Sequence, residues 1–167
     1  ACVLAAEVAL TRIFSAVLRY HFVFLVISVA ICGMGVGGLL VYGVGRLRNT
    51  SAAAAAAGFS ATMTLFIIAL FRVVLVHFPT SLWLIAVLVM MPFIFAGMYL
   101  AVMFRRYSND AAELYAWDLA GAAAAAVLVV VLMQAINPVN TCLAIATGAG
   151  ILSVLSTPRR AGPLAIT

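Results

Sequence analysis

Long apolar segments alternate with short polar breaks along the whole chain. The apolar segments cover residues 1–18, 20–44, 52–76, 82–104, 111–136 and 141–156. A helix rises 1.5 Å per residue, so about 20 apolar residues cross a hydrocarbon layer ~30 Å thick. Turn-forming residues separate the segments, as in the Asn137-Pro138-Val139-Asn140 stretch. The pattern therefore predicts an all-α fold, a polytopic transmembrane helix bundle of about six spans.

The composition excludes a soluble domain. Hydrophobic residues make up 68% of the 167 residues and charged residues 8%, whereas soluble domains average roughly 45–50% and about 25%. All basic residues are arginines, and most of them stand at span ends, where they act as topology signals and meet anionic lipid headgroups. The net charge of +5 therefore predicts contact with a lipid bilayer and not with nucleic acid.

The arginines also predict an orientation. The ends of the second, fourth and sixth spans carry Arg46, Arg48, Arg105, Arg106, Arg159 and Arg160, against Arg12, Arg19 and Arg72 for the other side. Because arginine is enriched in cytoplasmic loops, both termini are expected in the cytoplasm. The expected location is the bacterial inner membrane, with residues 158–167 as a cytoplasmic tail or a truncated linker.

A glycine-rich stretch inside the second segment allows two interpretations. Gly33 to Gly38 spells G-x-G-x-x-G, the phosphate-binding turn of dinucleotide-binding folds. That turn needs a preceding strand and an acidic residue roughly 20 residues later, yet no acid occurs between Glu7 and Asp110. The sequence therefore favours a membrane helix over a nucleotide site, and it predicts no cofactor.

The same glycines form two lines of small residues on the predicted helix. One line holds Ala30, Gly33 and Gly37, and the other holds Ser28, Cys32, Gly35 and Gly38. Small residues at helical spacing let membrane helices approach closely. The lines predict a central helix with neighbours on two sides, and Gly121 belongs to a segment that could supply a thin partner. The alternative is that glycine is simply common in membrane helices.

Four ionisable residues fall inside or close to predicted spans, namely Glu7, Arg12, Arg72 and Asp118. Charges at that depth are costly and are candidates for function. They would either relay a proton or cation, or pair with one another and hold the bundle in register. At the start of the fifth segment, Asp110 and Glu113 have the spacing of a capping box.

The sequence predicts no catalytic residues and no metal site. His21 and His77 stand alone, and the three cysteines lack paired spacing.

Three stretches together resemble a known family. They are residues 7–15, residues 20–38 with Tyr20-His21-Phe22 leading into the glycines, and residues 114–122 with Tyr115, Asp118 and Gly121 in a Y-x-x-D-x-x-G pattern. In that order they resemble the multi-span N-terminal region of membrane-integrated spermidine synthase-like proteins. The resemblance implies a helical membrane part joined to a cytoplasmic Rossmann-like aminopropyltransferase domain. That soluble domain is absent from these 167 residues, so no catalytic role is assigned.

The expected function is therefore that of a membrane anchor or a structural subunit. It would pack against other membrane protein subunits or support a soluble domain. One alternative is a transport module for a small cationic solute such as a polyamine, with Glu7 and Asp118 as its charges. Another is the membrane part of an aminopropyltransferase whose catalytic domain is missing. A cavity that reaches both acids would favour transport.

Overall fold

A computed structural model describes residues 2–17, 22–44, 51–76 and 82–155 of the chain. This part contains six α-helices and no strand. The helices are α1 (Cys2–Val17), α2 (Phe22–Gly43), α3 (Ala52–Val76), α4 (Leu82–Arg106), α5 (Ala111–Ile136) and α6 (Pro138–Leu155). The prediction of an all-α helical bundle is confirmed. The largest difference in bounds is at α6, which begins at Pro138 and not at Thr141, because proline fits the first turn of a helix. The predicted tail, residues 158–167, lies outside the described residues.

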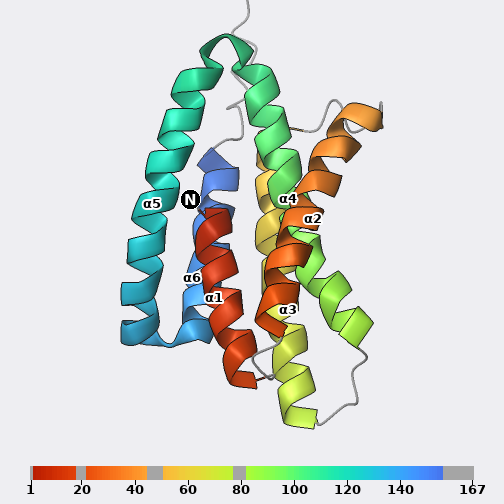
Figure 1. Cartoon of the computed structure of the whole chain (residues 1–167), viewed down its shortest axis with the longest axis vertical. Coiled ribbons are helices and arrows are strands. Elements are labelled where there is room, and N and C mark those ends of the chain that lie inside the picture. The colour runs from red at the N-terminus through yellow and green to blue at the C-terminus, as the bar shows by residue number, and fades with distance from the viewer. Residues whose placement is uncertain (1, 18–21, 45–50, 77–81, 156–167) are drawn as a thin grey trace, which may run out of the picture.

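The helices run alternately in opposite directions (Figure 1). The ends of α2, α4 and α6 all lie toward the end of the molecule that carries the turn between α4 and α5. The connections between consecutive helices are short, and short connections place neighbouring helices antiparallel.

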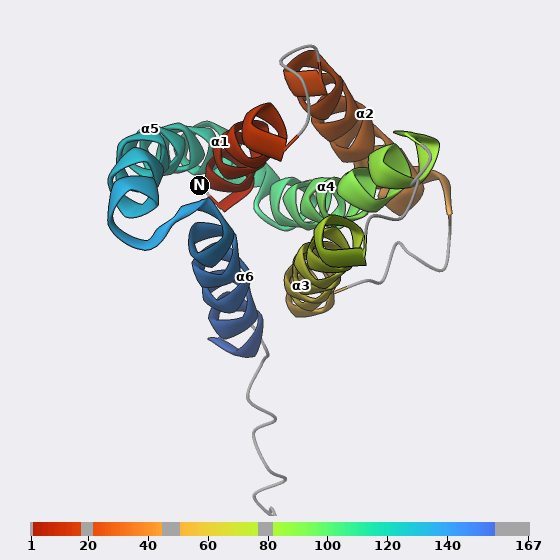
Figure 2. The ribbon, with the colours of Figure 1, turned by 90° about the horizontal axis from the view of Figure 1, so that it is seen from below.

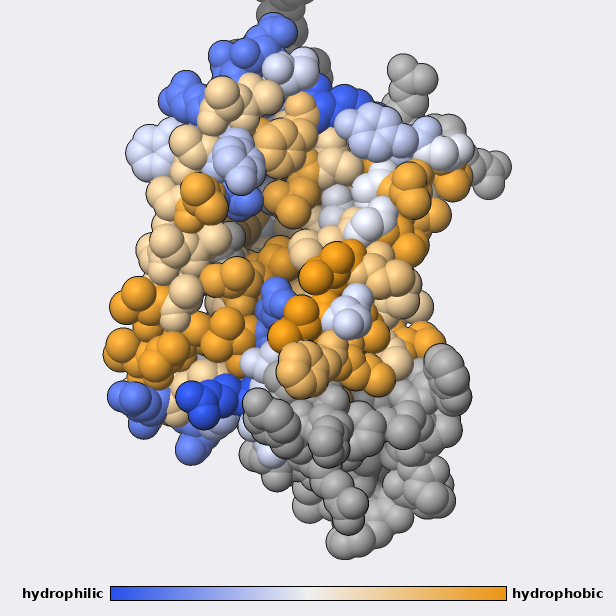
Figure 3. Space-filling view, viewed as in Figure 1, coloured by the Kyte–Doolittle hydropathy of each residue, from blue (hydrophilic) through white to orange (hydrophobic). Residues whose placement is uncertain are grey.

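Five of the described helices, α2 to α6, are long and apolar enough to cross a membrane. The exception is α1, which has 16 residues and carries Glu7, Thr11 and Arg12. Figure 3 shows the matching surface, in which hydrophilic residues gather over the α4–α5 turn and over the lower end of α5. A hydrophobic belt lies between these two ends. This is the surface expected of a membrane-embedded helical protein.

The short helix α1 lies between α5 and α2 and also contacts α6 (Figure 2). Its buried face holds six residues, Ala5, Ala6, Ala9, Leu10, Ile13 and Phe14. The Phe14 ring stacks on Phe66 of α3, with centroids 6.1 Å apart. Because α1 has apolar residues on one face and polar residues on the other, its orientation follows from its own sequence.

Side-chain hydroxyls join α3 to α6. Ser60 Oγ donates a hydrogen bond to the backbone oxygen of Ala146 at 2.7 Å, and Ser153 Oγ donates to the backbone oxygen of Ala53 at 2.9 Å. Such bonds contribute to membrane helix association, where apolar burial against lipid gives little driving force.

The turn between α5 and α6 rests on Asn137, whose φ is 67° and ψ is 151°. Few residues other than glycine adopt this backbone conformation. The Asn137 carbonyl accepts hydrogen bonds from Thr141 N at 3.0 Å and Thr141 Oγ1 at 2.9 Å. The bond from Thr141 N is the first backbone bond of α6, and both bonds help to hold the Asn137 carbonyl in place.

Candidate functional site

The closest helix contact in the described structure joins α2 to α4 through three glycines. A Cβ added to Gly33 would lie 2.9 Å from Phe93 Cβ and 3.0 Å from the Met90 oxygen. One added to Gly37 would overlap the Ile94 oxygen, and one added to Gly97 would overlap the Met34 oxygen. The two helix backbones therefore touch with no side chain between them, which only glycine permits.

The residues of the first small-residue line are buried, because Ala30, Gly33 and Gly37 all face α4 or the bundle interior. The second line differs. A Cβ on Gly35 or on Gly38 would meet no atom of the described chain within 4 Å, and Cys32 is exposed. A neighbouring helix packed against this second line stays a prediction. Gly121 lies half-buried on α5.

The predicted intramembrane charges lie in different places. Glu7 is half-buried on α1, where Arg12 is exposed. Arg72 belongs to α3, and its side chain lies outside the described residues. Asp118 is half-buried on α5 and has an interaction within the chain.

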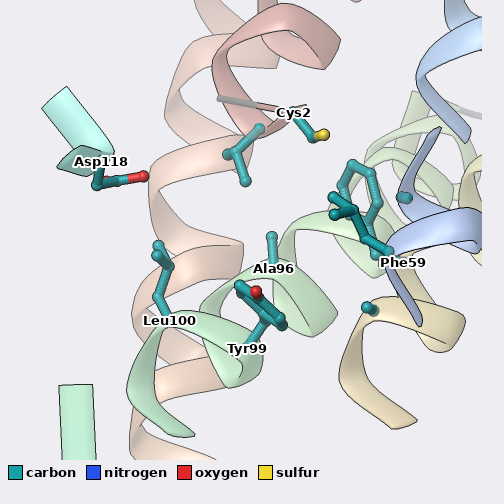
Figure 4. Close-up of a pocket in the computed structure, with 10 residues that line it drawn as sticks. Cys2, Phe59, Ala96, Tyr99, Leu100 and Asp118 are labelled. Carbon is teal, nitrogen blue, oxygen red and sulfur yellow. The ribbon is translucent and has the colours of Figure 1, made fainter. Parts of the chain in front are cut away.

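Asp118 lines a partly open cavity of about 230 Å³ between α1, α3, α4, α5 and α6. Figure 4 shows the Asp118 side chain pointing from α5 toward Leu100 and the end of α1 that carries Cys2. Tyr99 stands on α4 and lines the same cavity. The helix α1 contributes Cys2 and Val3 to the wall, but not Glu7. This cavity therefore contains one of the two acids that transport was expected to use.

Two further cavities extend this one along the space between α4 and α5. A cavity of about 210 Å³ shares Tyr99, Leu100 and Asp118 with the first. A third, of about 300 Å³, shares Met103, Leu114 and Trp117 with the second. We call the three together the α4–α5 groove. On the face shown in Figure 3, the surface is hollowed between the α5 side and the α4 side.

Polar and aromatic residues surround the outer end of the groove, beside the α4–α5 turn. Asp110 occupies the N-cap position of α5 but makes no cap hydrogen bond through its side chain, so the expected capping box does not form. Instead, Glu113 Oε1 accepts a hydrogen bond from Trp117 Nε1 at 3.4 Å. The Arg106 guanidinium carbon lies 6.0 Å from the centroid of the Tyr107 ring.

The sequence alone singled out Asp118 but not Tyr99 or Trp117, which lie on the same groove. The available signal was the clustering of aromatic residues near the ends of two spans, which is typical of membrane interfaces. That signal does not indicate that the two helices face each other across a cavity. Among the described residues, no three of His, Cys, Asp and Glu gather where they could hold a metal ion.

Comparison with models of known protein families, with curated proteins and with solved structures finds no match. The resemblance to spermidine synthase-like proteins therefore rests on the three sequence stretches alone.

Proposed function

We propose that this chain is the membrane part of a spermidine synthase-like protein and works as a rigid membrane anchor or structural subunit. The observation that carries the proposal is the α2–α4 contact through Gly33, Gly37 and Gly97. A helix pair in backbone contact has no side chains that could rearrange between two packings, and it suits a fixed support better than a moving part.

The exposed apolar surface supports the same proposal. Most of α5 is exposed, and Val129 is the residue of this helix that is buried. The second line of α2 is also uncovered at Gly35 and Gly38. Surfaces of this kind meet lipid or the helices of another membrane protein.

Transport of a cationic solute by Glu7 and Asp118 acting together has less support. The cavity at Asp118 reaches α1 through Cys2 and Val3, one to two helical turns away from Glu7 along the helix. A relay between the two acids would need a polar path through the bundle. The residues of α1 that face the bundle interior are apolar.

The anchor proposal also includes an orientation, with Arg105 and Arg106 on the cytoplasmic side. Reporter fusions test it. Green fluorescent protein joined at the Ser108–Asp110 turn should fluoresce, and alkaline phosphatase at the same position should be inactive. Fusions at Asn137 should behave in the opposite way.

An anchor must also stay in the bilayer without help. The full chain with a soluble reporter at its end should remain in the membrane fraction after alkaline carbonate extraction. Release of the reporter by carbonate would contradict the proposal. Accumulation of a polyamine in proteoliposomes that is lost in a Glu7→Gln, Asp118→Asn double variant would favour transport instead.

A further inference from the structure

Asp118 stands at the boundary between the polar and apolar parts of α5. From Ala111 to Asp118 the helix carries Glu113, Tyr115 and Trp117, whereas the following residues are almost entirely apolar as far as Met133. The stretch from Leu119 to Ile136 has a length of about 27 Å, close to the thickness of a bilayer's hydrocarbon core. With this stretch crossing the hydrocarbon core, the Asp118 carboxylate would lie at the depth where headgroups and water begin.

The groove combines one carboxylate with several aromatic rings and an apolar wall. Tyr99, Phe104 and Trp117 line the same 210 Å³ cavity as Asp118, together with Leu100 and Leu114. Trp117 is 71% exposed and donates a hydrogen bond of 3.4 Å to Glu113, so its indole lies at the open rim of the cavity. Aromatic faces attract cations, and a nearby carboxylate adds a direct charge interaction.

This combination selects an organic cation over a metal ion. Calcium binds six to eight oxygen atoms, and magnesium holds an octahedron of oxygens. The wall of this cavity offers the Asp118 carboxylate and the Tyr99 hydroxyl among apolar and aromatic residues. An alkylammonium or quaternary ammonium ion needs few ligands, because its methyl or methylene groups lie favourably against aromatic rings.

We propose that the α4–α5 groove is a binding site for a small organic ammonium ion, with Asp118 as its counter-charge and Tyr99 and Trp117 as aromatic walls. The outer end of the groove carries Asp110 and Glu113, and Arg106 beside Tyr107 offsets part of their negative charge. Asp118 keeps its interaction within the chain. A carboxylate has about four acceptor positions, so Asp118 can interact with its partner within the chain and with the ammonium ion at the same time.

The chain itself places a cation on an aromatic ring at the outer end of the groove. The Arg106 guanidinium carbon lies 6.0 Å from the centroid of Tyr107, within the distance at which the ring attracts a positive charge. Because the Arg106 guanidinium already lies over the Tyr107 ring, the ammonium site lies deeper in the groove, at the level of Tyr99 and Asp118.

The test uses choline, a quaternary ammonium ion, and 3,3-dimethyl-1-butanol, in which a carbon atom replaces the charged nitrogen. The full chain is placed in phosphatidylglycerol nanodiscs, which contain no ammonium group, and binding of radiolabelled choline is measured. Choline should bind saturably, and the neutral analogue should compete at least about tenfold more weakly. Equal competition by the two compounds, or no choline binding, would overturn the proposal.

Variants then locate the site. Asp118→Asn should weaken choline binding at least about tenfold, since a charge-assisted interaction is lost. Trp117→Leu should weaken it several-fold, and Glu7→Gln, outside the groove, should bind as the original chain does. A folded Asp118→Asn protein with unchanged affinity would refute the assignment. If this variant does not fold, Trp117→Leu and the comparison of choline with its analogue decide the question.

The ammonium ion can come from water or from a lipid headgroup. Nanodiscs in which phosphatidylcholine replaces half of the phosphatidylglycerol separate the two sources. Loss of choline binding identifies the lipid headgroup as the ligand, and unchanged binding identifies a free solute.

Discussion

Replacement of Gly37 by alanine should separate α2 from α4, whereas the same change at Gly38, one residue along the helix, should not. A Cβ at position 37 would overlap the Ile94 oxygen and lie 2.9 Å from Met98 N, both of which are backbone atoms. Backbone atoms cannot rotate out of the way, so the helices must move apart. At Gly38 the Cβ would meet no atom of the described chain within 4 Å.

The expected magnitude follows from two opposing effects. Alanine is a better helix former than glycine by about 1 kcal/mol, and this gain applies equally to both positions. Overpacking at Gly37 costs about 1–3 kcal/mol. A gap of about 1 Å between the helices would also lose a quarter to a half of the dispersion energy of the contacts it opens. The Gly37→Ala protein should therefore be less stable than the Gly38→Ala protein by at least about 1–3 kcal/mol.

Equilibrium unfolding in mixed micelles, followed by circular dichroism, measures this difference. Both alanine variants gain the same helix propensity, so the difference between their unfolding free energies reports the effect on the contact with α4. Gly35→Ala serves as a second control, since position 35 also has no neighbour within 4 Å. If the Gly37 and Gly38 variants unfold with free energies that agree within about 0.5 kcal/mol, the backbone contact does not stabilise the bundle and the reasoning fails.

Three further predictions concern other parts of the bundle and use the same unfolding assay. Ser60→Ala and Ser153→Ala should each destabilise the protein by about 0.6 kcal/mol, the average for hydrogen bonds between membrane helices; no change in either would remove these bonds as a source of stability. Phe14→Ala should cost roughly 2 kcal/mol, below the ~3–5 kcal/mol typical of soluble cores, because lipid is as apolar as the bundle interior. Phe24→Ala, at an exposed position, should change little, and equal effects of the two would contradict the burial of Phe14. Asn137→Gly should stabilise the α5–α6 turn by about 1 kcal/mol, since glycine adopts a positive φ without strain; a loss of stability would show that the asparagine side chain matters more than its backbone.

The membrane charges illustrate how far prediction from sequence reached. Asp118 was recognised as unusual because a carboxylate beside a long apolar segment is costly. Its position beside Tyr99 on the α4–α5 groove was not predicted, because the two residues lie on different helices and nothing local links them. The expected capping role of Asp110 was wrong, because its side chain makes no cap hydrogen bond and the Glu113 side chain accepts a hydrogen bond from Trp117 within α5.

The sequence by itself determined the class of protein and the six helices. These features depend on the length and local pattern of apolar residues. Only the tertiary structure decided which glycines of α2 form a contact. That helix is apolar all round, and lipid is as apolar as protein, so either small-residue line could have faced a neighbour. The packing against α4 selected Gly33 and Gly37 and left Gly35 and Gly38 uncovered.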